Sequence, residues 1–198
     1  MFFRQVYNEF EYITIIYSPF KGGIILEQLW KDTARFHGHE CPGLAIGFKA
    51  ALAAREYFEI SSTDDEDLVC ISENDACGID AIQYLLKCTV GKGNLLIKMR
   101  GKSAYNFFDR TKNRSIRLVL KDMNKDMTRE EKQNYLLNHD SNELFDYTEV
   151  RHQIPERARI FNNVTCSNCG EKLAEHFARI QDNKPVCLDC FTEYKRFD

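Results

Sequence analysis

Four of the eight cysteines lie near the end of the chain, in two pairs with the same internal spacing. Cys166 and Cys169 form one pair, Cys187 and Cys190 form the other, and 17 residues separate the pairs. Two intervening residues let both sulfurs of a pair reach one ion, and four thiolates complete a tetrahedral shell with no open position. The spacing predicts a structural zinc site; two disulfides or a redox pair are the alternatives. His176 lies between the pairs, and we expect it at the surface.

A second group of candidate ligands lies in segment 36–43, FHGHECPG. If this segment is extended, His37, His39 and Cys41 point to one side. If it continues a helix, His37 and Cys41 meet one turn apart and His39 points elsewhere. Pro42 suits the first position of the next helix and makes Cys41 its N-cap, where the helix dipole and free N–H groups favour a thiolate. A thiolate beside an imidazole is typical of a metal ligand or a nucleophile.

Cys77 lies in segment 73–80, ENDACGID, where a strand is expected to end and a helix to begin. It falls in the first turn of that helix, so the same dipole argument applies to it, and Asp80 shares its face. The alternative is purely structural, with Asp75 as the N-cap, Asp80 as a first-turn acid and Cys77 as a small buried residue.

These residues predict a second site in the core. The candidate ligands of a second divalent metal are His37, His39, Cys41 and Cys77. Mixed nitrogen and sulfur donors suit zinc, and an open fourth position would allow catalysis. Cys41, His39 and Cys77 are accordingly the candidate catalytic residues. In the alternative interpretation, the histidines only cap and orient the turn.

The sequence Gly101-Lys102-Ser103 invites comparison with a phosphate-binding loop. That loop needs a glycine five residues before Gly101, and the position is occupied by Leu96. The segment is therefore not a P-loop. Lys102 remains a candidate cation of a pocket or of the surface.

Composition narrows the class of protein. The 198 residues are 43% hydrophobic and 29% charged, with a net charge of −3, as in soluble globular proteins. No apolar run approaches the roughly 18–20 residues that cross a membrane. No global basic field would attract nucleic acid. We expect a cytoplasmic protein without a membrane partner, in which cysteines serve metal and thiolate chemistry.

The pattern of apolar and turn residues predicts an α+β fold. Helices are expected over 25–36, from Pro42 onward, over 76–86 and over 128–137, and strands over 12–17, 68–72, 95–99, 104–108 and 115–120. Strand and helix runs mix without strict alternation. Cys70 and Cys88, which have apolar neighbours, are expected in the core. The composition shifts near residue 154, which predicts a core domain over 1–153 and a small zinc-finger domain over 154–198.

Two segments carry a resemblance to a known family. FHGHECPGLAIGFKAA and ENDACGIDAIQYLLKCTVGKGNLLIKMRGKSAYNFF resemble the FmdE family, named for one of the subunits of formylmethanofuran dehydrogenase, over roughly residues 27–120. The tail pattern CSNCGEKL…PVCLDC resembles the short TraR-type zinc fingers, which contact proteins or nucleic acids.

The resemblance implies an α+β core that forms homodimers and a cleft for metal binding or catalysis lined by His37, His39, Cys41 and Cys77. It also implies a link to one-carbon and molybdopterin-dependent metabolism, with subunits of a molybdenum or tungsten oxidoreductase as candidate partners. The family's pterin and formyl-transfer chemistry resides in other subunits. The aromatic segments 1–18 and 104–108 are more than one small core needs, which favours an interface.

Two classes of function follow. The first is a metal- or thiol-dependent protein that uses the core site, either as an enzyme or as an accessory subunit. The second is a zinc-finger module without catalytic activity that contacts protein or nucleic acid through its tail. Metal content separates them, because two metals per chain favour the first class and one favours the second.

Overall fold

The computed structural model describes residues 22–60 and 66–197. The strand expected over 12–17 and the aromatic segment 1–18 lie outside these residues. The chain divides into a first compact unit that ends at Arg157 and a second that begins at Ala158.

A five-stranded sheet in the order β2-β1-β3-β4-β5 forms the centre of the first unit. β1 and β2 are parallel, and the other neighbouring pairs are antiparallel. The strands are β1 (Leu68–Ser72), β2 (Leu95–Ile97), β3 (Ala104–Asp109), β4 (Arg114–Leu120) and β5 (Phe145–Thr148). The parallel pair follows from the helix that connects β1 to β2, because such a crossover returns the chain in its original direction.

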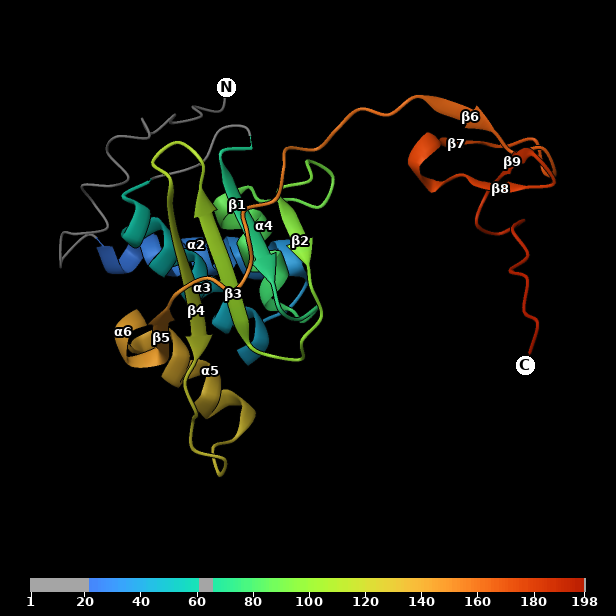
Figure 1. The fold of residues 1–198 in the computed structure, drawn as a ribbon. Coiled ribbons are helices and arrows are strands. Elements are labelled where there is room, and N and C mark those ends of the chain that lie inside the picture. The colour runs from blue at the N-terminus through green and yellow to red at the C-terminus, as the bar shows by residue number, and fades with distance from the viewer. Residues whose placement is uncertain (1–21, 61–65, 198) are drawn as a thin grey trace, which may run out of the picture. The chain divides into compact units, whose positions relative to one another are not determined.

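Three helices cover one face of this sheet (Figure 1). They are α2 (Gly22–His37), α3 (Pro42–Phe58) and α4 (Gly78–Leu86), and the shorter α5 (Arg129–Asn138) and α6 (Ser141–Leu144) lie between β4 and β5 in the chain. A capping box of Thr128 and Glu131 opens α5, at the start of the helix expected over 128–137. Helices and strands are mixed without strict alternation, so the predicted α+β class is confirmed.

Alternate residues of the strands enter two separate clusters. Leu68, Cys70 and Phe107 pack under the helices, together with Cys88, which confirms that Cys70 and Cys88 are core residues. Val69, Ile71 and Phe108 face the opposite side, where Val150 packs against them. Residues 149–157 cross that side of the sheet (Figure 1). Arg110 Nη2 donates to the Pro155 carbonyl at 2.6 Å, so this segment packs with the first unit.

The covering of both faces changes the interpretation of the aromatic segment 104–108. Tyr105, Phe107 and Phe108 are all buried within one chain. The sequence-based prediction that this segment forms an exposed interface was therefore wrong, because β3 is the middle strand of a sheet covered on both sides.

α3 and α4 approach one another through glycine. A Cβ atom at Gly47 would overlap the backbone of Gly78, and one at Gly78 would overlap the hydroxyl of Tyr105. Small residues of α3 allow a neighbouring element to approach closely, and α4 is that neighbour. This approach brings the start of α4 against the first turns of α3.

The second unit contains little hydrophobic core. Among its described residues only Cys166 and Val186 are buried. It consists of the hairpin of β6 (Asn163–Thr165) and β7 (Lys172–Ala174), a short 3-10 helix (Glu175–Phe177), and the hairpin of β8 (Arg179–Gln181) and β9 (Lys184–Val186). Hairpins this short are marginal by themselves.

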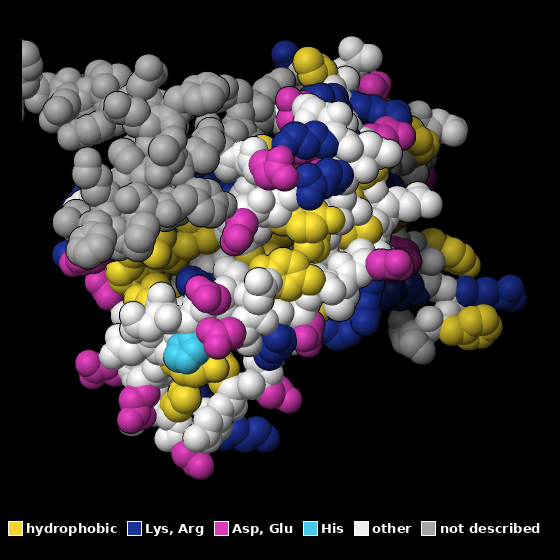
Figure 2. Space-filling model, turned by 90° about the vertical axis from the view of Figure 1, so that its left-hand side faces the viewer, with side chains coloured by type: hydrophobic (Ala, Val, Ile, Leu, Met, Phe, Trp, Pro, Cys, Tyr) yellow, Lys and Arg dark blue, Asp and Glu magenta, His cyan; other side chains and the backbone are white. Residues whose placement is uncertain are grey.

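Within the described residues, every helix is too short or too polar to span a bilayer. Figure 2 shows one face of the molecule, on which acidic and basic side chains are interspersed with apolar ones. Neither sign of charge dominates that face.

Candidate metal centres

His37, Cys41 and Cys77 converge in the first unit. One donor atom from each lies within 4.8 Å of the other two. His37 is the last residue of α2, and Cys41 and Cys77 are the N-caps of α3 and α4. Three helix ends therefore meet at one point.

Local backbone structure explains how His37 meets Cys41. α2 continues through His37 and stops at Gly38, whose φ of +99° suits glycine. Cys41 then takes an extended conformation, and its Sγ accepts a hydrogen bond from the Leu44 amide at 3.3 Å. The predicted N-cap is confirmed. The structure matches neither of the two arrangements that the sequence left open, because the helix ends at His37 and Cys41 is extended. His37 and Cys41 nevertheless meet, as the helical arrangement expected.

Asp80 fixes the orientation of the histidine. Its Oδ2 lies 2.6 Å from His37 Nδ1. A carboxylate accepts a hydrogen bond at this position, so Nδ1 is the donor, and in the neutral imidazole Nε2 then presents its lone pair. His37 Nε2 lies 3.9 Å from Cys41 Sγ. The imidazole thus offers the tautomer that a metal ligand requires.

The donor set fits a zinc-like ion. Zn–N and Zn–S bonds of about 2.0 and 2.3 Å at tetrahedral angles would place nitrogen about 3.5 Å from sulfur. The distance of 3.9 Å between His37 and Cys41 is close to that value. His39 stays outside the group: it is exposed, and its ring lies against the ring of His37 at a tilt of 38°, with centroids 4.6 Å apart.

Cys77 reaches the cluster because Gly43 leaves room for it. A Cβ at Gly43 would lie 3.3 Å from Cys77 Cβ and 3.6 Å from its sulfur. Burial, and then the neighbouring sulfur of Cys41, raise the pKa of the Cys77 thiol. The helix dipole therefore does not dominate at Cys77, contrary to the prediction from sequence, and a metal would have to displace the thiol proton.

A buried ion pair holds the turn that carries Cys77. Glu73 accepts hydrogen bonds from Arg117 through both carboxylate oxygens, at 2.6 and 2.9 Å, and from the Asn106 side chain at 3.0 Å. These bonds lower the pKa of Glu73 to about 2. Because Glu73 directly follows β1, its anchoring to β3 and β4 fixes the start of the β1–α4 turn. Sequence reasoning missed this network, since 44 residues separate Glu73 from Arg117.

The four tail cysteines form a second cluster. Their sulfurs all lie within 4.8 Å of one another. After the first pair, Gly170 has a φ of +77° and donates its amide to the Cys166 carbonyl at 3.0 Å. After the second pair, the Phe191 amide donates to the Cys187 carbonyl at 2.9 Å. His176 is exposed and stacks against Phe161.

The surroundings of the tail sulfurs shift the pKa values of Cys166 and Cys190 in opposite directions. Backbone N–H groups, first that of Cys169 and then that of Cys187, lower the pKa of Cys166 to about 6. Neighbouring sulfurs, that of Cys187 first, raise the pKa of Cys190 to about 12. One thiolate is thus stabilised by the backbone, and a divalent cation would stabilise the others.

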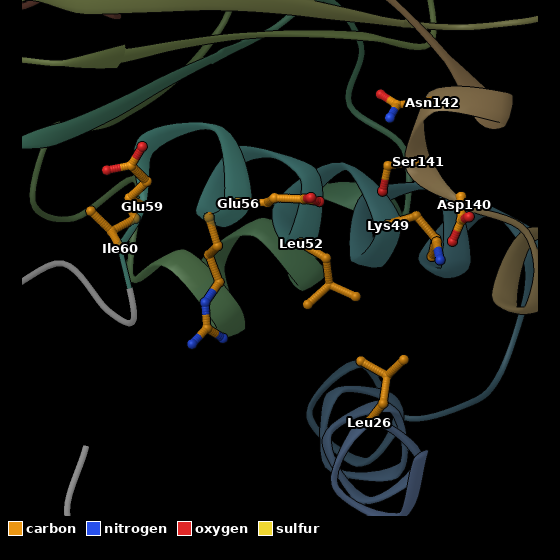
Figure 3. A pocket seen from close by; sticks show the side chains of 10 residues that line it. Leu26, Lys49, Leu52, Glu56, Glu59, Ile60, Asp140, Ser141 and Asn142 are labelled. Carbon is orange, nitrogen blue, oxygen red and sulfur yellow. The ribbon is translucent and has the colours of Figure 1, made fainter. Parts of the chain in front are cut away.

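A cavity of about 540 Å³ lies elsewhere in the first unit, between α2, α3 and α6. Figure 3 shows Leu26 and Leu52 facing one another across it and Lys49 lying beside Asp140. Burial lowers the pKa of Lys49, and the carboxylate of Asp140 partly opposes this. None of the three core donors lines this cavity.

The sequence profile of the FmdE family, described as molybdenum formylmethanofuran dehydrogenase operon, matches residues 36–166. This match spans well over half of the chain and includes all three core donors. The chain belongs to the FmdE family. Its match ends at the first cysteine of the tail, so the TraR-type resemblance of the tail rests on the cysteine pattern alone.

Two proteins similar to this FmdE-family chain extend the comparison. A crystal structure of a tungsten formylmethanofuran dehydrogenase FmdE-like protein from Syntrophus aciditrophicus superposes with a TM-score of 0.62. It is 22% identical and covers 83% of this chain and 91% of that one, which establishes a shared fold. A probable S-adenosyl-L-methionine-binding protein of Archaeoglobus fulgidus is 26% identical over 205 residues. The match covers 85% of this chain but only 54% of that relative.

Proposed function

We propose that this FmdE-family protein binds two metal ions with different roles. The tail cysteines hold a structural zinc, and the core site holds a second divalent metal, best suited to zinc, through His37, Cys41 and Cys77. The observation that carries the proposal is the bond of 2.6 Å between Asp80 and His37. It directs Nε2 toward two sulfurs, as outer carboxylates do in histidine metal sites.

The chain's own residues would make the core site a binding centre with one open position. A divalent metal there supplies Lewis acidity toward a group placed at that position. Cys41 is 3% exposed, so the surrounding helix ends exclude water from one side. Cys77 is less buried and lies on the more accessible side.

A second candidate function is nucleophilic catalysis by Cys41. Asp80, His37 and Cys41 form a chain of the kind that activates thiol nucleophiles, with an acid orienting a base that faces the sulfur. The burial of Cys41 and the convergence of Cys77 favour the metal. Thiol labelling as a function of pH, with and without a chelator, separates the two candidates. Labelling of Cys41 that is fast at neutral pH and insensitive to chelation would select the nucleophile.

The family supports further parts of the proposal. We expect the protein to act in the cytoplasm, where thiolates stay reduced, and to form a homodimer. We also expect it to serve as a metal-dependent accessory to a molybdenum or tungsten oxidoreductase of one-carbon metabolism. Light scattering at micromolar concentration tests the dimer, and a monomer mass would contradict it.

Elemental analysis of the purified full chain tests the central proposal. Two divalent metals per chain are expected, falling to one in Cys41→Ser with the fold retained. Cys70→Ser, a buried cysteine outside both clusters, is the matched control and should keep both metals. One metal in the wild type would instead favour a zinc-finger binding module with a structural core.

A further inference from the structure

Lysines line a hollow at one end of the sheet, which we name the basic cleft. It has a volume of about 450 Å³. Its polar lining includes Lys102, Ser103, Lys121, Lys125 and Lys132, and the carboxylate is that of Asp122. Val119, Leu120 and Met123 add apolar surface. Four lysines and one acidic residue thus line the cleft.

The lining of the basic cleft carries an excess of positive charge. Lys121 donates to the Asn142 carbonyl at 2.7 Å and lies 3.8 Å from Asp146. For Lys102, Lys125 and Lys132, the described part of the chain places no carboxylate within ion-pair distance. A concave surface with an excess of charge of one sign concentrates ligands of the opposite sign.

One part of the cleft lining is hydrogen-bonded to the turn that carries Cys77. Asn74, three residues before Cys77, donates its side-chain amide to the Lys102 carbonyl at 2.7 Å. Arg100, two residues before Lys102, donates its backbone amide to the Glu73 carbonyl at 2.8 Å. The segment that presents Lys102 therefore lies directly against this turn.

Another part of the cleft lining lies next to the turn that carries Cys41. Lys132 belongs to α5, and the next residue, Gln133, donates to Glu40 Oε2 at 2.9 Å. Glu40 immediately precedes Cys41. Figure 1 shows the end of β4, the start of β3 and α5 at the same end of the sheet. Two parts of the cleft lining thus lie next to the two turns that supply the sulfur donors of the core site.

The geometry points to a ligand with an anionic group, a phosphate or a carboxylate, that binds in the basic cleft through Lys102, Lys125 and Lys132. Lysine ammonium groups act as point charges toward both kinds of anion. The apolar surface of Val119 and Met123 accommodates a carbon skeleton next to the anion. Anion binding in the cleft does not depend on the function proposed above. A ligand that also reaches the core metal does depend on it, and in that case the substrate is a small anionic molecule.

Calorimetric titration of the full chain with pyrophosphate and with citrate tests the inference. At least one of the two anions is expected to bind, and added salt should weaken binding. Tighter binding of pyrophosphate identifies a phosphate group, and tighter binding of citrate a carboxylate. Lys102→Gln and Lys132→Gln should each weaken binding about tenfold, the effect of losing one charge-assisted contact. Lys125→Gln, at an exposed loop position, gives a third variant with little risk to folding.

Lys31→Gln is the matched control, because Lys31 lies on α2 outside the cleft. It should leave the dissociation constant unchanged. Absence of binding by both anions, or equal affinities in all these variants, overturns the inference. The same titration of Cys41→Ser distinguishes the two proposals. If the variant loses the core metal but still binds the anion, the anion site is independent of the metal. If the wild-type protein binds two metals but no anion, the proposed function is kept and the anion site is rejected.

Discussion

The core and tail clusters hold their cysteines in different ways. In the core, three helix ends that pack on a five-stranded sheet bring together His37, Cys41 and Cys77. Asp80 orients the histidine through a bond of 2.6 Å. In the tail, two short hairpins join four sulfurs, and only two described residues are buried.

This difference indicates what each metal would contribute. The core donors are placed by packing that exists without an ion, so a metal there would serve binding or chemistry. The tail has almost no apolar burial, so its metal would supply the folding free energy of that unit. Removing a metal ligand should therefore unfold the tail but leave the first unit folded.

Paired ligand substitutions should give the largest effect. Cys187→Ser should unfold the tail, because structural zinc contributes about 10–16 kcal/mol of binding free energy in zinc-finger peptides at neutral pH. Cys77→Ser should remove the core metal while leaving the first unit folded. Limited proteolysis with elemental analysis measures both. A tail that stays folded in Cys187→Ser, or a first unit that unfolds in Cys77→Ser, would break the comparison.

The buried ion pair beneath the core site should give the next largest effect. Glu73→Gln leaves the Arg117 charge buried without its partner and should destabilise the first unit by about 3–5 kcal/mol. The folded-state pKa of Glu73, about 2, lies below its ordinary value of 4.5. The contribution of ionised Glu73 to the free energy of unfolding is therefore fully present above about pH 4.5 and is lost as the pH falls toward 2.

Denaturant unfolding of Glu73→Gln between pH 7 and pH 3 measures this contribution. The difference from wild type should shrink as the solution becomes more acidic. Glu27→Gln makes the same change in an exposed pair with Lys31 and should not shift the unfolding midpoint measurably. Equal stability of Glu73→Gln and wild type at pH 7 would contradict the role assigned to the pair.

Loss of the orienting carboxylate should give the smallest of these effects. Asp80→Asn should weaken binding of the core metal by about 10- to 100-fold, the range for outer-shell partners. The tail metal should bind as before. Competition with a chromophoric chelator gives both affinities. Asp75→Asn, an exposed change in the same turn, serves as the control, and the same loss in both variants would contradict a specific role for Asp80.

Local patterns predicted much of the fold. Apolar spacing identified the helices at 25–36 and 76–86 to within a few residues, and the strands β1, β3 and β4 lie where the pattern of apolar residues placed them. Pro42 and Thr128 marked the starts of α3 and α5, because caps depend on adjacent residues. The tail cluster was predictable for a similar reason, since the spacing within each pair lets both sulfurs reach one ion. The grouping of Cys77 with Cys41 rested on two expected helix starts and on the family resemblance.

Contacts between distant segments were not predictable in this way. Asp80 and His37 lie 43 residues apart, and neither periodicity nor capping links them. The approach of Gly47 to Gly78 could be anticipated only as a need for some neighbour. The aromatic segment 104–108 suggested an interface because strand order, which places β3 in the middle of the sheet, is not a local property.

X-ray absorption spectroscopy at the zinc edge of the zinc-loaded full chain tests the central claim most directly. A tail site with four sulfurs and a core site with two sulfurs and one histidine nitrogen give an average of about three sulfurs per zinc, together with nitrogen scattering. Cys41→Ser should shift the average to about four sulfurs and remove the nitrogen signal. A wild-type spectrum of sulfur alone, with one zinc per chain, would contradict a metal centre in the core.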